Sequence, residues 1–243
     1  MRSHGFTLVE LAAVFGLVSL LVALSVPAVR AMREAAADAK CKSNLREMAL
    51  AAIAYAEEHR GAFPPAMRGF DDCWDFRKTR DGWEPGEMWA YAAVPDSVLA
   101  CPKCYGESDN YAGVGFTGYN YNTSFAGRED YGGGKSGMRL TLRRVRNPSR
   151  MALFGDAGYG DPESMNKFMR APRVLRGYES SGSGIRKSGT QSFRHFGRSN
   201  VSFADGHVES LRQPYDISGN PRPQAGHTGF LSKGNALYCG DTF

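Results

Sequence analysis

Residues 6–29 read FTLVELAAVFGLVSLLVALSVPAV, and this stretch decides how the rest of the chain is organised. Glu10 is its only charged residue, and nothing ionisable occurs from Leu11 to Val29. An α-helix needs about 20 apolar residues to cross the hydrocarbon core of a bilayer. The stretch therefore predicts a single membrane-spanning helix.

A cleaved secretory signal peptide fits this stretch less well. Its apolar core has roughly 7–15 residues and ends at a site of small residues such as Ala-x-Ala. Here the apolar run is longer and leads through Pro27 into Arg30 and Arg33 without a clean Ala-x-Ala. We therefore expect the helix to remain in the mature protein.

Glu10 needs a partner, because a carboxylate inside an apolar helix costs free energy. If the chain is cut between Gly5 and Phe6, the new α-ammonium of Phe6 lies about one helical turn from Glu10. The Phe6 terminus of a neighbouring subunit in a helical filament is an equally good match. Only one stagger of packed helices would then neutralise the charge, so Glu10 is expected to set the register of assembly.

The start of the chain, Met1-Arg-Ser-His-Gly5 followed by Phe6-Thr-Leu-Val-Glu10, resembles the class III signal of type IV pilins and type II secretion pseudopilins. In that family a prepilin peptidase removes a short basic leader after Gly, the new Phe is N-methylated, and the fifth mature residue is Glu. Gly5, Phe6 and Glu10 match position by position. The resemblance implies cleavage after Gly5 and methylation of Phe6. The alternative is an ordinary signal anchor whose Glu10 lies near the membrane surface.

The length of 243 residues allows one membrane helix and one soluble domain of ordinary size. A hydrophobic content of 42% and a charged content of 23% predict a folded chain. The net charge is +5, but 25 acidic residues accompany 30 basic ones. This mixed surface is not typical of nucleic-acid-binding proteins, so no nucleic-acid partner is expected.

Residues 30–60 are rich in strong helix formers, which predicts that the helix continues beyond the membrane. Pro27 is expected to kink or locally melt it, and Gly61 followed by Pro64-Pro65 predicts its end. Apolar residues at three- and four-residue steps predict one buried stripe, formed by Leu45, Met48, Ala49, Ala52, Ile53 and Ala56.

Residues 61–243 are richer in Gly, Asn, Ser and aromatic residues and predict a β-rich domain. Met151–Phe154 fits a buried central strand, since it is a short apolar run bounded by Asn-Pro and Gly-Asp. A short helix is expected at 87–93, turns or loops at 119–122 and 132–134, and a mobile Ser/Gly-rich loop at 178–189.

Asp205-Gly206 lies between two alternating five-residue runs, which predicts a hairpin with a two-residue type I′ turn. That turn pairs Phe203 with Val208 and places both on one face with Val201. We expect this face to cover the helix stripe.

These patterns predict an α+β fold in which a long N-terminal helix packs on an antiparallel β-sheet. The expected divisions are a leader at 1–5, a transmembrane and filament-core helix at 6–29, an amphipathic continuation at 30–60 and a globular β-rich domain at 61–243. A second resemblance supports this: His195, nine residues, then Asp205-Gly206 is similar to the signature of a prepilin-like family. Further matches to that family are Cys41-Lys-Ser-Asn-Leu-Arg, Cys101-Pro, Tyr119-Asn-Tyr and Asn147-Pro-Ser-Arg-Met-Ala-Leu-Phe.

The chain has five cysteines, and outside the cytoplasmic membrane we expect disulfides with one thiol left over. A Cys41–Cys101 bond is favoured because it would join the helix to the domain, although spacing does not determine connectivity. Cys101-Pro-Lys-Cys104 looks like one knuckle of a zinc ribbon. No second pair exists, and the single residues Cys73 and Cys239 would have to complete the site, so zinc is disfavoured.

His195, Asp205 and His207 are candidates for metal binding or acid–base chemistry. A structural interpretation is favoured, because a hairpin turn explains Asp205 and His207, and His195 is able to hydrogen-bond backbone in the preceding loop. No cofactor is predicted. Calcium stays open at loop carboxylates, with no spaced ligand loop, and its candidate ligands are Asp156, Asp161 and Asp205.

The sequence has no Gly-x-Ser-x-Gly elbow, His-Glu-x-x-His helix or phosphate loop, so it does not predict an enzyme. Gly113-Val-Gly115-Phe-Thr-Gly118 imitates a dinucleotide fingerprint, but it lacks the flanking strand and helix.

We predict a non-catalytic filament subunit of a type IV pilus or type II secretion pseudopilus. It would span the cytoplasmic membrane once, with the domain outside the cytoplasm. The implied partners are prepilin peptidase, homologous subunits, the inner-membrane assembly platform and membrane lipid. Two alternatives stay open: an envelope binding or adhesion domain that is anchored but does not polymerise, and an envelope enzyme using His195 and Asp205.

Overall fold

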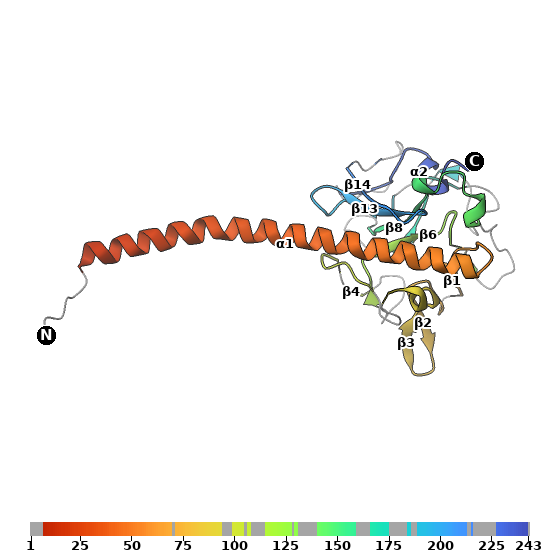
Figure 1. The fold of residues 1–243 in the computed structure, drawn as a ribbon, viewed down its shortest axis with the longest axis horizontal. Coiled ribbons are helices and arrows are strands. Elements are labelled where there is room, and N and C mark those ends of the chain that lie inside the picture. Colours follow the sequence, from red (N-terminus) through yellow and green to blue (C-terminus); the bar gives the residue numbers. More distant parts are fainter. Residues whose placement is uncertain are drawn as a thin grey trace. The chain divides into compact units, whose positions relative to one another are not determined.

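The structure is a computed structural model, and it describes residues 7–69, 71–93, 99–104, 106–107, 115–127, 129–130, 140–158, 166–174, 184–185, 189–212, 215 and 227–242. The chain divides into two compact units, one ending at Ala39 and the other beginning at Lys40. Helix α1 (Leu8–Glu58) supplies residues to both units (Figure 1). By length and composition, α1 is able to cross a membrane.

Of the two expected effects of Pro27, a kink or local melting, melting does not occur, because helix α1 continues without interruption through this residue. All side chains from Leu8 to Arg33 are exposed. The helix ends where predicted, near Gly61. Arg60 and Gly61 have φ angles of 58° and 84°, and the Gly61 N–H donates to the Ala56 carbonyl at 2.7 Å. This is the hydrogen bond of a Schellman C-cap.

The second part of α1 has the apolar stripe that the sequence predicts. Five of the six predicted positions are buried and Ile53 is half-buried. The charged residues of the opposite side are exposed or half-buried. The stripe belongs to the same hydrophobic core as the sheet, and its buried members are Leu45, Met48, Ala49, Ala52 and Ala56.

The main sheet has five strands in the order β14-β13-β8-β6-β9. Its pairs are antiparallel except β6 with β9, which is parallel. The fold is therefore α+β, as predicted. The strands are β6 (Tyr119–Asn122), β8 (Ala152–Asp156), β9 (Phe168–Met169), β13 (Ser199–Phe203) and β14 (Val208–Leu211).

The central strand predicted at Met151–Phe154 is confirmed as β8, which is buried throughout. The predicted loop at 119–122 is wrong, because these residues form β6, a fully buried strand beside β8. Successive side chains of β6 have different partners, which explains why polar residues occur in a buried strand. Tyr121 stacks on Phe154 with ring centroids 4.7 Å apart, while the Asn122 amide donates to the Ala152 and Tyr238 carbonyls. Asparagine is tolerated in this buried strand because its amide finds backbone acceptors.

The β13–β14 hairpin has a different register from the predicted one. Ser202, not Phe203, pairs with Val208. The turn is longer than two residues: the Gly206 N–H donates to the Phe203 carbonyl, and Gly206 has a φ of 87°. This is the pattern of a type I turn followed by a glycine bulge. Phe203 therefore stacks on His207, with ring centroids 4.4 Å apart.

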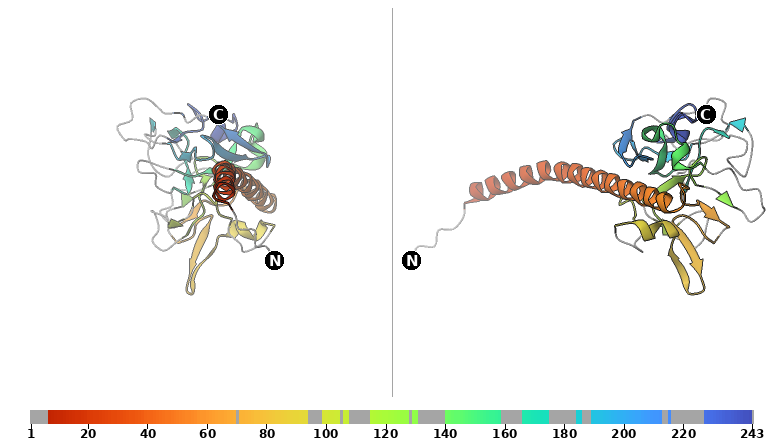
Figure 2. Two further views of the ribbon diagram at one scale, coloured as in Figure 1. Left: turned by 90° about the vertical axis from the view of Figure 1, so that its left-hand side faces the viewer. Right: turned by 45° about the vertical axis from the view of Figure 1, so that its right-hand side comes forward.

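Shorter elements complete the domain. The helix predicted at 87–93 is confirmed as the 3₁₀ helix η1 (Glu87–Tyr91). The hairpin of β2 (Phe76–Thr79) and β3 (Gly82–Pro85) projects from the domain (Figure 2). The others are β1 (Met67–Arg68), β4 (Gly106–Glu107), β5 (Gly115–Phe116), β7 (Glu129–Asp130), η2 (Leu142–Arg144), η3 (Pro148–Arg150), β10 (Arg173–Val174), β11 (Gly184–Ile185), β12 (Gln191–Ser192), β15 (Thr228–Gly229) and α2 (Ala236–Cys239).

Two loop predictions fall mainly on residues that are not described. Residues 132–134 lie outside the described residues, as do 178–183 and 186–188. Within the predicted loop 178–189, Gly184–Ile185 forms strand β11, which pairs with β10.

Candidate functional site

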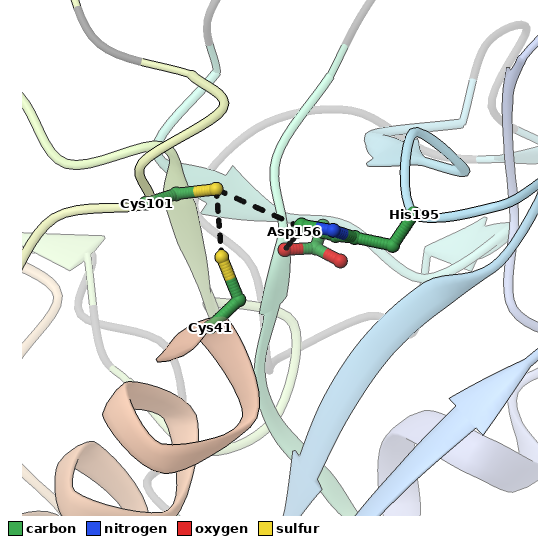
Figure 3. Close-up of side chains that lie close together, drawn as sticks. All are labelled: Cys41, Cys101, Asp156 and His195. Carbon is green, nitrogen blue, oxygen red and sulfur yellow. Dashed lines mark hydrogen bonds and ion pairs between the residues drawn. The ribbon is translucent and has the colours of Figure 1, made fainter. Parts of the chain in front are cut away.

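Four buried side chains from distant parts of the sequence converge in the domain (Figure 3). Cys41 lies on α1, Cys101 lies in the segment between η1 and β4, Asp156 ends β8, and His195 precedes β13. One potential ligand atom from each residue lies within 4.8 Å of each of the others. We call these four residues the Cys-Cys-Asp-His cluster.

The atoms of the cluster face one another at short distances. The Cys41 and Cys101 sulfurs are 2.9 Å apart, and both cysteines are free in this structure. The Cys101 sulfur lies 3.7 Å from His195 Nε2, which in turn lies 3.6 Å from Asp156 Oδ1. One ring nitrogen therefore faces both a sulfur and a carboxylate oxygen.

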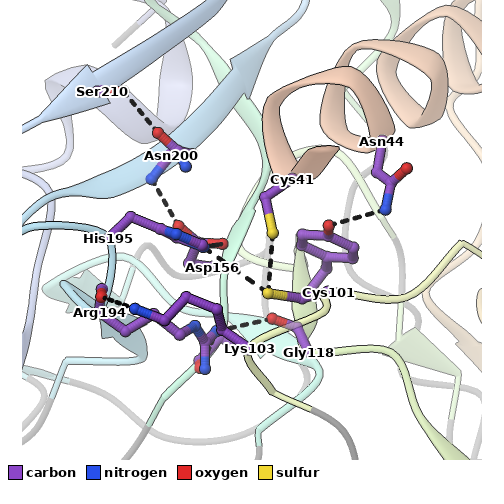
Figure 4. Close-up of polar contacts among 12 residues, drawn as sticks. Cys41, Asn44, Cys101, Lys103, Gly118, Asp156, Arg194, His195, Asn200 and Ser210 are labelled. Atoms are coloured by element: carbon purple, nitrogen blue, oxygen red, sulfur yellow. Dashed lines mark hydrogen bonds and ion pairs between the residues drawn. The ribbon is translucent and has the colours of Figure 1, made fainter. Parts of the chain in front are cut away.

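Cys41 and Cys101 are brought together by α1 and the segment that packs on it. One helical turn after Cys41, the Asn44 amide donates to the Ala100 carbonyl at 2.9 Å and to the Tyr119 hydroxyl at 3.1 Å (Figure 4). The Cys101 N–H donates to the Thr117 carbonyl at 2.7 Å. These bonds hold the Cys101 backbone beside the helix.

One carboxylate oxygen of Asp156 faces the cluster, and the other accepts a hydrogen bond from the neighbouring strand β13. Its Oδ2 accepts the Asn200 backbone N–H at 2.7 Å. Among the described residues its Oδ1 has no hydrogen-bond partner, although the side chain is completely buried. A buried carboxylate oxygen without a hydrogen bond is costly, so this atom indicates an interaction beyond those that the described residues make.

His195 is positioned by a tight turn. His195 and Arg198 exchange two backbone hydrogen bonds, of 3.1 and 2.9 Å, across Phe196 and Gly197. Both intervening residues have positive φ, 53° and 71°, which is the geometry of a type I′ turn. A two-residue type I′ turn therefore lies at Phe196-Gly197, a different place from Asp205-Gly206, where the sequence predicts one.

Two basic residues lie next to the cluster (Figure 4). The Arg194 guanidinium donates to the Gly118 and Ala157 carbonyls at 2.8 Å, and Lys103 Nζ donates to the Arg194 carbonyl at 2.8 Å. Arg194 thereby places a fixed positive charge close to Cys101.

The environment polarises the two cysteines in opposite directions. Hydrogen bonding from Cys41, assisted by His195 and the charge of Arg194, lowers the pKa of Cys101 to about 5. The hydrogen bond with Cys101, together with burial, raises the pKa of Cys41 above its usual range. Burial alone would lower the pKa of His195, but Asp156 and Cys101 outweigh it and raise this pKa to about 9. The two shifts favour the thiolate form of Cys101 and the protonated form of His195.

This geometry differs from that of a catalytic Cys-His-Asp triad. In a triad the nucleophile and the acid contact different ring nitrogens, whereas here Cys101 and Asp156 both face Nε2 of His195. All four side chains are also buried. A surface pocket of about 510 Å³ is lined by Arg173, Lys233, Gly234, Asn235, Ala236, Cys239 and Asp241, and so includes none of the cluster.

Asp205 and Gly206 lie in the β13–β14 turn. The acid facing His195 is Asp156, whereas Asp205 lies 2.5 Å from His207 Nδ1 and accepts its backbone N–H. Of the calcium candidates, Asp156 belongs to the cluster, Asp205 contacts His207, and Asp161 lies outside the described residues.

The remaining cysteines are not part of the cluster. Cys73 and Cys239 are buried, and Cys104 is half-buried. Cys101 and Cys104 form an isolated antiparallel backbone bridge.

Glu10 has partners in its own chain. The Thr7 N–H and hydroxyl donate to Glu10 Oε2 at 2.8 and 2.9 Å, and the Glu10 N–H donates to the Thr7 hydroxyl at 3.2 Å. This is a capping box, which the spacing Thr-x-x-Glu could have revealed. Gly5 and Phe6, the predicted cleavage and methylation residues, lie outside the described residues.

Comparison with known families gives one match. Residues 30–96 match the family model described as "Protein of unknown function (DUF1559)". That family is associated with pilin-like proteins. The matched segment contains Cys41 and ends before Cys101. Comparisons with curated proteins and with solved structures gave no match.

Every member of the cluster is a candidate residue from the sequence alone, but the members belong to separate predictions and no prediction groups the four. Cys41 and Cys101 are a candidate disulfide, and Asp156 is a candidate calcium ligand. His195 is part of the motif His195, nine residues, Asp205-Gly206. The sequence contains a partial signal, since Asp156 comes two residues after the apolar run 151–154 and is therefore expected near the end of that strand.

Proposed function

We propose that this protein is a non-catalytic, pilin-like subunit whose N-terminal helix anchors it in a membrane and then packs with copies in a filament. One observation carries the proposal: the apolar part of α1 has no buried face. Its large exposed side chains are Leu8, Val9, Leu11, Val14, Phe15, Leu17, Val18, Leu20, Leu21, Val22, Leu24, Val26, Val29 and Met32.

A helix that is apolar on all sides needs an apolar environment around it. Lipid supplies that environment before assembly, and the same segment of neighbouring subunits supplies it in a filament. Gly16 has no side chain, so a neighbouring helix could approach closely at this position. The match of residues 30–96 to a family associated with pilin-like proteins supports the same class.

The proposal includes processing and location. Prepilin peptidase would cut between Gly5 and Phe6, and Phe6 would be methylated. The protein would reside in the cytoplasmic membrane with its domain outside the cytoplasm, and the inner-membrane assembly platform would transfer it into a type IV pilus or a type II secretion pseudopilus.

Mass spectrometry of the mature amino terminus tests this function. A chain that begins with N-methylated Phe6 is the expected result in cells that contain a prepilin peptidase. Recovery of the chain with Met1 to Gly5 still attached would contradict the proposal.

A specific observation favours a second function, an anchored envelope binding domain that does not polymerise. Because the capping box already engages Glu10, the carboxylate does not require the amino terminus of a neighbouring subunit. Electron microscopy and cross-linking of the apolar helices in cells separate the two functions, since only a filament subunit gives ladders of cross-linked copies.

A further inference from the structure

We propose that the Cys-Cys-Asp-His cluster is a structural zinc site, in which Cys41, Cys101, Asp156 and His195 bind one Zn²⁺. This proposal is independent of the filament function. It concerns a buried part of the domain that the filament function does not use.

The donor set is typical of zinc. Structural Zn²⁺ is almost always tetrahedral and takes Cys sulfur, His nitrogen and carboxylate oxygen as ligands. Two sulfurs and an imidazole disfavour Mg²⁺ and Ca²⁺, which prefer oxygen ligands. The cluster supplies four ligand atoms, which is the number a closed structural site requires.

Two of the three measured separations fit ligands arranged around one ion. With Zn–S of about 2.3 Å and Zn–N and Zn–O near 2.1 Å, tetrahedral geometry places S and N about 3.6 Å apart and N and O about 3.4 Å apart. The corresponding distances are 3.7 Å for Cys101 to His195 and 3.6 Å for His195 to Asp156. An imidazolium in direct contact with a carboxylate would lie closer, at about 2.7–2.9 Å.

The separation of the two sulfurs does not decide between a metal and a disulfide. Two zinc-bound sulfurs lie about 3.8 Å apart, and two disulfide-bonded sulfurs about 2.05 Å apart. The observed 2.9 Å lies between these values. Asp156 and His195 decide the question, because a Cys41–Cys101 disulfide would leave the buried Oδ1 of Asp156 still without a hydrogen bond among the described residues.

The surroundings also suit a bound cation. Two thiolates and one carboxylate carry three negative charges, which Zn²⁺ reduces to one, and Arg194 lies next to Cys101 to offset the remainder. The Asn200 N–H holds Asp156 Oδ2, so that Oδ1 alone faces the ion. Such outer contacts orient metal ligands in known sites.

A zinc ion here would join four separate segments of the domain: α1, the segment between η1 and β4, the end of β8 and the turn before β13. All four coordination positions come from protein, so none is open for a substrate. The site is therefore structural rather than catalytic.

The experiment uses the full chain purified in detergent without chelator, followed by metal analysis. We expect about one Zn²⁺ per chain, retained in the presence of reductant. Replacing Zn²⁺ with Co²⁺ should give thiolate-to-cobalt charge-transfer absorption, and chelator should lower the thermal unfolding midpoint.

Variants test the ligand assignment. Cys41→Ser should weaken the charge-transfer band by about half, and Asp156→Asn should reduce cobalt affinity at least tenfold, in line with lost metal ligation. Cys73→Ser is the matched control, because Cys73 is a buried cysteine outside the cluster, and it should leave both readouts unchanged.

Three results would overturn the proposal. The first is a chain that binds neither Zn²⁺ nor Co²⁺ when its cysteines are reduced. The second is a Cys41–Cys101 disulfide in protein isolated without reductant, seen as a linked peptide pair. The third is a cobalt absorption band that neither Cys41→Ser nor His195→Gln changes. This result does not depend on whether Asp156→Asn folds.

Discussion

Glu10 contributes both hydrogen bonds with Thr7 and a negative charge. Substitutions can remove one of these without the other. Glutamine also serves in a capping box, so Glu10→Gln keeps the contacts with Thr7 and removes only the charge. If the charge sets the register of packed helices, Glu10→Gln and Glu10→Ala should both reduce filament yield about tenfold or more while cleavage after Gly5 continues. Immunoblotting of sheared filaments against whole cells measures the yield.

The control for this experiment is Thr7→Ala, which breaks the capping box and keeps the carboxylate. We expect near-normal filament yield from this variant. A different result would show that Glu10 acts through the helix cap alone: a filament yield as low in Thr7→Ala as in Glu10→Ala, together with a normal yield in Glu10→Gln.

The buried ion pair of Asp75 and Lys167 gives a second prediction at the scale of a residue. Lys167 Nζ lies 2.9 and 3.1 Å from the two carboxylate oxygens of Asp75, and both side chains are almost fully buried. Lys167→Met should cost about 3–5 kcal/mol at neutral pH, because it leaves a buried carboxylate without its partner. Urea unfolding of the full chain in detergent measures the loss.

The pH dependence of this loss has a definite sign. Burial raises the pKa of Asp75 above its usual range, and Lys167 opposes that rise. Without the lysine, folded Asp75 holds its proton to a higher pH than the unfolded chain does, so stability falls as the pH rises above about 4. The deficit of Lys167→Met should therefore shrink at acid pH. Adding Asp75→Asn should restore part of the stability at pH 7, and a deficit independent of pH would argue against this account.

At the scale of elements, the β13–β14 turn depends on Gly206. Its φ is 87°, and a Cβ there would lie 3.1 Å from Leu50 Cδ2 on α1. Gly206→Ala should destabilise the domain by about 1–2 kcal/mol, the cost of a left-handed conformation for an L-residue. Gly234→Ala is the control, since that glycine has no positive φ and no atom within 4 Å of the added Cβ. Equal unfolding midpoints for the two variants would show that the turn tolerates a side chain.

At the scale of the whole molecule, membrane association should depend on the apolar segment alone. A chain that lacks residues 6–29 should move from the membrane fraction to the soluble fraction, because the removed residues hold most of the exposed apolar side chains. Ultracentrifugation after alkaline extraction measures the distribution. Retention of the shortened chain in the membrane would point to a second attachment in the domain.

Much of the fold was predictable because its signals are local. The three- and four-residue spacing from Leu45 to Ala56 predicts the buried stripe, and the apolar run at 151–154 predicts β8. The strand at Tyr119–Asn122 was missed because asparagine in a buried strand depends on acceptors far away in the sequence, such as Tyr238. The hairpin register was missed by one residue because Asp-Gly suits either a two-residue turn or a type I turn with a bulge.

The candidate site was not predictable as a unit. Each member has an ordinary local explanation, and only the packing of α1 against the sheet makes them neighbours. No periodicity in the sequence connects Cys41 with His195, so their proximity required the tertiary structure.

The order in which the cluster residues occur along the chain has a consequence for biogenesis. Cys41 is made first and His195 is made last, 154 residues further along the chain. If the domain is exported as proposed, Cys41 and Cys101 emerge well before Asp156 and His195, and their thiols meet the surroundings without the acid and the imidazole beside them. Until the last cluster residues arrive, the early pair would be exposed to oxidation or to mispairing with Cys73 or Cys104, and a thiol-protecting chaperone would raise the yield of correctly folded protein.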